Sequence, residues 1–366
     1  MKRDGGNMSV SFDRPDTREV AAASVRDRWS GYPSSGLTPR RLTRILRQAD
    51  SGDLVGQMEL FSEMEEKDAH LFSCLQTRKL AVSGMGWEVT PPDGGGTDAS
   101  SFVKNALDGI DNFEESLMDL LDAVGKGFSV SEVIWEVGRD GVAPRALKKR
   151  PQKRFTFLTE DGGSDMPRLL TDKGPVYGEP LVADKFVVHV YRAGADMPER
   201  GGLLRVLSWV YVFKNYALKD WVSFCEVFGM PMRLGVYSPS ASKEDRETLL
   251  QAVTQLGSDA AGIISESTRI EFVEASRRGE AGPYPVLVEL LNRELSKAVL
   301  GQTLTTDVGS TGSYAAGMVH QEVRMDIARA DARSLARTVN RDLIRPLVMY
   351  NFGRDARPPM LKFELN

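Results

Sequence analysis

The sequence is poor in the residues that most catalytic and metal-binding sites require. Its 366 residues include only two cysteines and three histidines. The histidines lie far apart in the chain, and none is spaced with a cysteine or an acidic residue as metal ligands are. Cys74 and Cys225 each fall in an apolar helical pattern, which is typical of free buried thiols in a reducing compartment. We therefore expect no metal, no cofactor and no disulfide.

Long apolar runs and an excess of basic residues are also missing. No window approaches the roughly 18–20 consecutive apolar residues that span a bilayer, and the first residues lack the apolar core of a secretory signal. We therefore expect no membrane partner. The net charge is −4, whereas proteins that hold DNA tightly are usually basic, because their affinity comes from neutralised phosphates. Any contact with DNA is expected to be weak or limited to local patches.

The sequence patterns of nucleotide hydrolysis and of nucleases are absent too. A glycine–lysine pair within residues 125–129 lacks the upstream glycine of a phosphate-binding loop and precedes a strand rather than a helix. No Gly-x-Ser-x-Gly pattern occurs. Glu63, Glu65, Glu66 and Asp68 are interpreted as a solvated helix face and not as a two-metal site. We therefore predict that the chain is not an enzyme and has no catalytic residues.

The first half of the chain reads as an α+β domain. Residues 1–36 are rich in Gly, Ser, Asp and Arg without a sustained period, which predicts a flexible N-terminal arm. Thr38-Pro39 is typical of a helix start. Helical periodicity over residues 54–82 and alternating strand patterns near 128–137, 155–157 and 185–191 complete the domain, which we place at residues 37–200.

The helix that starts at Thr38-Pro39 is basic. Its four arginines are either a contact strip for DNA or an acidic partner, or a solvated helix face; they are Arg40, Arg41, Arg44 and Arg47.

The second half has an unusual order of elements. A long helix is predicted from Leu203 to Phe228, about 40 Å at 1.5 Å per residue. A small α/β unit follows, with strands near residues 232–236, 262–264 and 270–273 around one helix. A second helix then ends near residue 300, a loop of small polar residues spans 301–316, and a last long helix runs from about 318 to 350.

This order resembles the stem, clip, stem and tunnel-loop sequence of portal proteins of tailed bacteriophages. Residues 228–235 look like the start of the clip, and Gly312-Ser313-Tyr314 looks like the end of the tunnel loop. Residues 37–42, 60–79 and 84–89 look like the N-terminal part of the Mu-like portal family. The resemblance covers nearly the whole chain from residue 36 to residue 366.

The resemblance implies a portal fold with an α+β wing, a two-helix stem, a small α/β clip, a tunnel loop and a long C-terminal helix. Because longer family members continue past the last helix, we expect the crown region to be reduced, absent or cut off here. The implied parts are a flexible arm (1–36), the wing (37–200), stem helix 1 (201–228), the clip (229–282), stem helix 2 (283–300), the tunnel loop (301–317) and the last helix returning to the wing or a reduced crown (318–366).

The implied function is a structural subunit of a ring of about twelve copies at one capsid vertex of the virion, assembled in the host cytoplasm. Such a ring conducts double-stranded DNA during packaging and ejection. The implied partners are further copies of the chain, DNA, the major capsid protein and scaffold, the terminase large subunit and a head–tail connector protein. Two alternatives stay open: another head–tail adaptor, or a subunit of a nucleic-acid-processing enzyme.

The resemblance also implies sites. DNA-channel candidates on the stem helices are Lys214, Lys219, Arg293 and Lys297, with salt bridges to Asp220, Glu289 or Glu294 of a neighbouring subunit as the alternative. Clip candidates for terminase and connector binding are Lys243, Glu244, Asp245, Arg246, Arg277 and Arg278. Tunnel-loop candidates are Thr303, Thr305, Thr306, Ser310, Thr311 and Ser313. Aromatic side chains cover several faces of the first stem helix, which favours burial against a neighbouring stem; they are Trp209, Tyr211, Phe213, Tyr216 and Trp221.

Deletion of residues 303–313 tests the tunnel-loop assignment. Small polar residues suit a segment that moves beside DNA, so we expect the deletion to leave ring formation intact and to damage DNA packaging or retention. The yield of filled heads measures the effect, and a normal yield would contradict the assignment.

Overall fold

The chain forms two units in the computed structural model. Residues 1–212 and 292–366 make up unit 1, and residues 213–291 make up unit 2. The structure describes residues 14–29, 31–92, 97–139, 141–191, 193–194, 196–228, 233–255, 261–266, 283–303 and 314–364. Two helices run from one unit into the other: α7 (Leu203–Phe228) and α9 (Tyr284–Leu300).

Capping side chains start the first helices of unit 1. Thr38 Oγ1 accepts a hydrogen bond from the Arg41 N–H at 3.2 Å, and Pro39 follows it, so the expected Thr-Pro start is confirmed. Asp68 likewise accepts from two N–H groups of the next turn. The helices of the first half are α1 (Pro39–Asp50), α2 (Val55–Lys67), α3 (Ala69–Ser83), α4 (Thr97–Asp108), α5 (Phe113–Leu120) and α6 (Ala123–Lys126), with short turns η1 (Val25–Asp27), η2 (Gln152–Arg154) and η3 (Pro198–Arg200).

Three antiparallel sheets join these helices. The central one has the order β3-β2-β7, the second β4-β5-β6, and the third pairs β1 with β10. The first eight residues of β2 are buried on both faces, because β2 contributes to two apolar cores. The bounds are β1 (Trp87–Thr90), β2 (Phe128–Gly138), β3 (Gly141–Arg150), β4 (Phe155–Thr159), β5 (Gly162–Leu169), β6 (Glu179–Pro180), β7 (Phe186–Val190) and β10 (Met360–Phe363). The expected strands at 128–137, 155–157 and 185–191 are confirmed.

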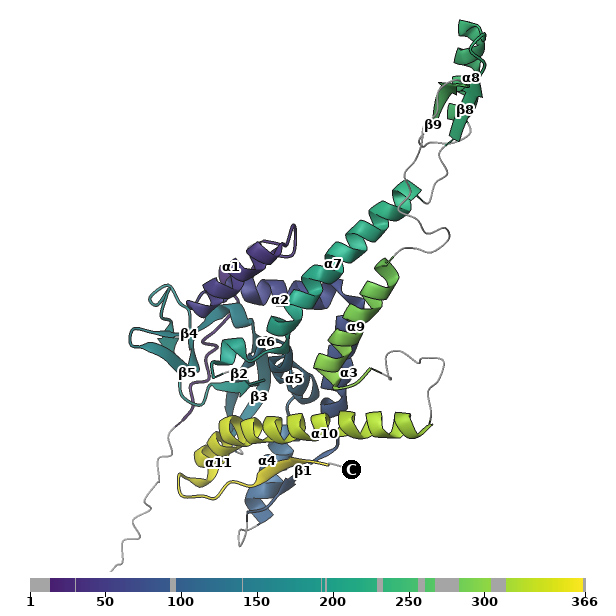
Figure 1. Ribbon diagram of the computed structural model, residues 1–366. Coiled ribbons are helices and arrows are strands. Elements are labelled where there is room, and N and C mark those ends of the chain that lie inside the picture. The colour runs from purple at the N-terminus through teal and green to yellow at the C-terminus, as the bar shows by residue number, and fades with distance from the viewer. Residues whose placement is uncertain are drawn as a thin grey trace, which may run out of the picture. The chain divides into compact units, whose positions relative to one another are not determined.

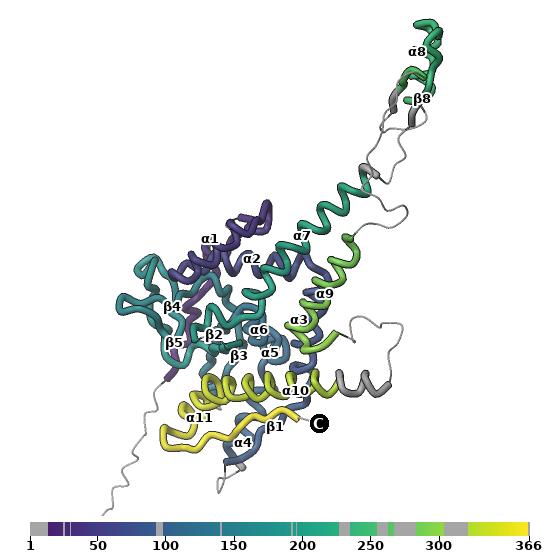
Figure 2. Tube along the Cα trace, in the orientation of Figure 1, coloured from purple at the N-terminus to yellow at the C-terminus, as the bar shows by residue number. Residues whose placement is uncertain are grey.

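The last part of the chain returns to the first half. The expected long helix is α10 (Tyr314–Val339), which continues through a π-helical turn, η4 (Asn340–Ile344), into α11 (Arg345–Phe352). Pro346 has no N–H to donate, so a regular α-helical hydrogen bond is missing here. Beyond α11 the chain runs back along α10, and β10 pairs with β1 (Figures 1 and 2).

Part of the N-terminal segment is held by the rest of unit 1, which differs from the flexible arm expected over residues 1–36. Ala21 is fully buried, and its N–H donates to Glu132 at 2.9 Å. Arg154 donates to the carbonyl oxygens of Ala21 and Ala22 at 2.8 and 2.9 Å. These long-range contacts hold a segment whose own sequence has no periodic pattern. Residues 1–13 lie outside the described residues.

Glu132, on β2, is the partner that holds this segment. Its carboxylate is fully buried and accepts hydrogen bonds from Arg150 Nε at 3.0 Å and Nη2 at 2.8 Å. Lys185 Nζ lies 3.9 Å away. A buried carboxylate is stable only when it is paired and hydrogen-bonded. Glu132 therefore fixes β2 and β3 to each other and to the N-terminal segment.

Unit 2 contains a small β-α-β arrangement between the far end of α7 and the beginning of α9. Strands β8 (Arg233–Tyr237) and β9 (Ala261–Ser265) are parallel, and α8 (Lys243–Gln255) connects them. The expected α/β unit with strands near 232–236 and 262–264 is thereby confirmed at the level of these elements. The strand expected near 270–273 lies outside the described residues.

Substitution Glu132→Gln should destabilise unit 1. The change removes the carboxylate that faces the buried Lys185 and leaves Arg150 with Glu19 as its acidic partner. Breaking a buried ion pair in this way lowers the free energy of unfolding by about 3–5 kcal/mol. Urea unfolding followed by tryptophan fluorescence measures it. Glu136→Gln, at an exposed position of the same strand, is the control and should stay within about 0.5 kcal/mol of the parent. Equal midpoints for both variants would refute the role of Glu132.

Candidate functional site

The two helices on either side of the expected tunnel loop meet at one arginine. Arg78, on α3, donates from Nε and Nη2 to the two carboxylate oxygens of Asp331 on α10, at 2.7 and 3.1 Å. Its Nη1 donates to the Val299 carbonyl on α9 at 2.8 Å, and Nη2 also donates to the Tyr191 hydroxyl at 2.9 Å. A planar guanidinium can satisfy several acceptors at once in a fixed geometry. Arg78 therefore sets the positions of α9 and α10 relative to α3.

This ion pair is buried, and its arginine keeps its charge. Arg78 and Asp331 are each 6% exposed. Burial alone would lower the pKa of Arg78, but the hydrogen bonds and the charge of Asp331 outweigh it and raise that pKa. The guanidinium is thus a permanent positive charge between the two helices.

A second contact supports the same end of α9. His70 Nε2 lies 2.7 Å from Ser296 Oγ, so α3 touches α9 one turn before Val299. Gly301 ends the helix with a φ of +70°, and a Cβ there would lie 2.9 Å from Ile327 on α10. Only glycine allows this conformation and this close approach without strain. Thr303 is half-buried just beyond this point, and the other tunnel-loop candidates, Thr305, Thr306, Ser310, Thr311 and Ser313, lie outside the described residues.

The four residues predicted to face DNA from the stem helices belong to different units of the structure. On α7 in unit 2, Lys214 is 7% exposed and Lys219 is exposed. On α9 in unit 1, Arg293 and Lys297 are both exposed, and Lys297 Nζ lies 2.7 Å from Glu294 Oε1 of the same helix. A DNA-facing role remains a prediction for the exposed three, and Lys214 would have to become exposed to take part.

The clip candidates are brought together only in part. Lys243, Glu244 and Asp245 form the exposed first turn of α8. The Arg246 guanidinium lies over the Tyr237 ring of β8, 4.7 Å from its centroid, and is half-buried. Arg277 and Arg278 lie outside the described residues.

A buried charged cluster shows that sequence reasoning missed several interactions. Asp122 is 3% exposed and binds Lys79 and Lys126 at 2.8 and 2.9 Å. Burial opposes ionisation of Asp122, but Lys126, Lys79 and Lys149 together hold its pKa well below the usual range. Gln152 Nε2 donates to the same carboxylate at 2.9 Å. The carboxylate is fully occupied by its partners, which is an arrangement for structure and not for proton transfer.

Two smaller expectations are corrected. The acidic face of α2 is not solvated as a whole, because Glu63 is fully buried beside Lys67, at 2.7 Å, and the neighbouring Asp68 caps α3. Cys74 is buried as expected, but Cys225 is exposed. Among the described residues, no group of His, Cys, Asp and Glu has the arrangement of a metal site, and no helix there is long and apolar enough to cross a bilayer.

Substitution Arg78→Lys tests the support of the helix pair. An ammonium group keeps the charge but cannot reach Asp331, Val299 and Tyr191 together. We expect the free energy of unfolding to fall by about 2 kcal/mol, the range of a lost charged hydrogen bond, and protease cleavage within residues 301–316 to become faster, as followed by mass spectrometry. Arg329→Lys, which alters an i,i+3 pair between a half-buried arginine and an exposed aspartate on α10, should change neither. Unchanged cleavage in Arg78→Lys would show that the contact does not restrain the loop ends.

Comparison with known proteins identifies the family. The family model described as "Portal protein of Mu bacteriophage" matches residues 58–366. The portal protein of Escherichia phage Mu is 36% identical over 347 residues, which cover 93% of this chain and 66% of that protein. The Mu-like prophage FluMu protein gp29 of Haemophilus influenzae is 36% identical over 368 residues, covering 99% of this chain and 70% of that protein. The chain thus spans about two thirds of the length of these relatives.

Solved structures share the fold at low identity. A chain in the neck of an empty gene transfer agent particle, computed with C6 symmetry, has a TM-score of 0.55 at 14% identity and covers 98% of this chain and 88% of that chain. A chain in the neck of a native particle, computed with C12 symmetry, has a TM-score of 0.53 at 14% identity and covers 90% and 85%. The chain therefore shares its fold with these neck chains. Since the family model and both relatives match most of its length, the chain belongs to the portal protein family of Mu-like bacteriophages.

Proposed function

We propose that this chain is the subunit of a ring of twelve copies at one vertex of a phage capsid, which conducts double-stranded DNA during packaging and ejection. Membership of the Mu portal family supports this proposal, and so does the shared fold with a chain in a particle neck computed with C12 symmetry. The role is structural rather than enzymatic, and the ring would assemble in the host cytoplasm before it becomes part of the virion.

An apolar stripe on α7 is the observation that carries the ring proposal. Val206, Trp209, Phe213 and Tyr216 recur three or four residues apart on this helix, and they are 66%, 38%, 49% and 37% exposed. By contrast, Tyr211 is buried in the core of unit 1. Side chains of this size rarely stay exposed at regular helical spacing unless a partner covers them. Aromatic side chains are enriched at subunit interfaces, so a neighbouring copy is the partner that we infer.

The first half of α9 repeats the feature. Val286, Leu287 and Leu290 are 69%, 41% and 51% exposed. Two helices that each leave apolar side chains uncovered favour side-by-side stems in a closed ring, where each copy presents one surface and receives another.

The proposed parts follow from this arrangement. We assign residues 37–200 to the wing, 201–228 and 283–300 to the stem, 229–282 to the clip, 301–317 to the tunnel loop, and 318–366 to the helix that returns to the wing. The exposed first turn of α8 would contact the terminase large subunit and later a head–tail connector, and the wing would contact the major capsid protein and scaffold. The net charge of −4 per subunit suits a conduit, because each neutralised phosphate adds affinity and would slow the passage of DNA.

The double substitution Phe213→Ser with Tyr216→Ser tests the ring. If these side chains pack against a neighbouring stem, the parent should have the mass of about twelve subunits by light scattering and a central channel in negative-stain images. The variant should shift to smaller species, since it loses the apolar area of two aromatic side chains.

The control is Val176→Ser with Tyr177→Ser, which removes two side chains that are 57% and 41% exposed in unit 1 and do not belong to α7. It should keep the ring. A parent chain that stays monomeric even with capsid proteins would overturn the proposed function, whereas intact rings of the α7 variant would overturn only the assignment of the stripe.

A further inference from the structure

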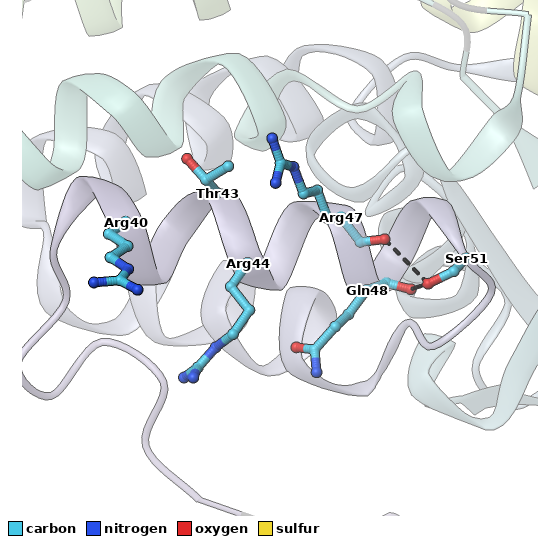
Figure 3. Close-up of a pocket in the computed structure, with 6 residues that line it drawn as sticks. All are labelled: Arg40, Thr43, Arg44, Arg47, Gln48 and Ser51. Carbon is cyan, nitrogen blue, oxygen red and sulfur yellow. Dashed lines mark hydrogen bonds between the residues drawn. The ribbon is translucent and has the colours of Figure 1, made fainter.

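One face of α1 presents arginines to solvent. Arg40, Arg44 and Arg47 are exposed and stand at positions i, i+4 and i+7 of the helix. Together with three neutral polar residues they line a shallow depression (Figure 3). Figure 3 shows Arg40, Arg44 and Gln48 on one flank of the helix and Thr43 and Arg47 on the adjacent flank. We call this set, completed by Ser51, the α1 basic face.

The arginines of this face have no acidic partner in the part of the chain that the structure describes. Asp50 is the one acidic residue of α1, and it is already bound to Arg205 at 2.7 Å and to Arg200 at 3.8 Å. Arg41 differs from the exposed three, because its guanidinium donates to the Ser35 carbonyl. The positive charge of the basic face is therefore not neutralised within the described structure.

This arrangement is unfavourable for the helix itself. Like charges four residues apart destabilise a helix by about 0.2–0.5 kcal/mol per pair. Arg40 and Arg41 also lie in the first turn, which has no acidic residue, although the positive end of the helix dipole favours anions there. The helix is held by its opposite side, where Leu42, Ile45 and Leu46 are buried. A local conflict of this kind is expected where a surface serves binding.

The chemistry of the basic face selects a phosphate backbone over a folded protein. Guanidinium groups bind phosphate oxygens in a bidentate way, and hydroxyl and amide groups such as those of Thr43, Gln48 and Ser51 commonly complete phosphate contacts. Protein interfaces are centred on apolar or aromatic anchors, whereas the exposed residues of α1 are all polar or charged.

We propose that the α1 basic face binds the phosphate backbone of double-stranded DNA without regard to base sequence, at a place separate from the candidates on α7 and α9. The inference rests on the proposed function, because a portal ring is what would bring DNA to this surface. Arg40 and Arg47 stand seven positions apart, about 10 Å along the helix, so one face touches only a few phosphates. A contact of this size restrains DNA weakly and is released by salt.

The test measures binding of a 30-base-pair duplex by fluorescence anisotropy at several salt concentrations. Each neutralised phosphate contributes about 0.9 to the slope of log K against log salt. The variant R40Q/R44Q/R47Q should therefore lower the magnitude of that slope by about 2.7. R40K/R44K/R47K keeps the charges and should retain most of the slope. Thermal unfolding should show the glutamine variant to be as stable as the parent or more so, because Gln is a good helix former and the repulsion is gone.

The matched control is R139Q/R145Q/R333Q, which removes three positive charges from exposed positions elsewhere on unit 1. Its slope should equal that of the parent. Equal slopes for the control and for R40Q/R44Q/R47Q would overturn the proposal. A competition experiment gives a second way to overturn it. If polyglutamate of matched charge displaces the labelled duplex as effectively as unlabelled duplex does, the face would be assigned to an acidic protein instead.

Light scattering on the same samples distinguishes a failure of the α1 inference from a failure of the proposed ring function. If rings form and the slope does not change in R40Q/R44Q/R47Q, the inference about α1 fails and the proposed function stands. If the parent forms no ring but the slope falls as expected, the proposed function fails and the phosphate site on α1 stands.

Discussion

The side chain of Arg78 is the contact on which the arrangement of α3, α9 and α10 depends. Apolar packing brings these helices together but leaves them free to slide, because it has little directionality. The guanidinium removes that freedom, since Asp331, Val299 and Tyr191 must all lie in reach of one planar group. Its burial makes the requirement strict, because a misplaced helix would leave a desolvated charge unpaired. The C-terminal end of α9 and the middle of α10 are therefore held against α3.

Unit 1 contains several charged groups that are buried and paired in this way, whereas its surface carries charges that are not. Glu132, Asp122 and Arg78 are each buried among opposite charges and hydrogen-bond partners. The exposed arginines of the α1 basic face, by contrast, have no acidic partner among the described residues. Their attraction for anions is screened within about 10 Å at ordinary salt.

The sequence predicts the elements of this protein better than it predicts their contacts. Periodicity locates the helix from Leu203 to Phe228, the Thr38-Pro39 start and the strands of the central sheet, because these depend on neighbouring residues. It misses β10, whose partner strand lies about 270 residues earlier. The buried pair of Arg78 and Asp331, separated by 253 residues, gives no local signal either. Long-range contacts also explain why the N-terminal segment was misjudged. Hydrogen bonds with Glu132 and Arg154 hold it in place, and its own sequence gives no sign of them. Among the site candidates, the exposed state of α8 and the basic helix α1 follow from local composition, whereas the burial of Lys214 depends on tertiary packing.

The pairing of β1 with β10 has a consequence for synthesis on the ribosome. Residues 87–90 emerge early, but their partner strand at 360–363 emerges about 270 residues later, and the second apolar core also needs α10 and α11. Unit 2 lies between these parts and is continuous in sequence. Its strands and helix can associate while the polypeptide is still being made, whereas one edge of unit 1 stays open until translation reaches residue 363. During that interval the unpaired edge of β1 and the uncovered core are exposed to other nascent chains. Unit 1 is therefore exposed to such contacts for longer during synthesis than unit 2.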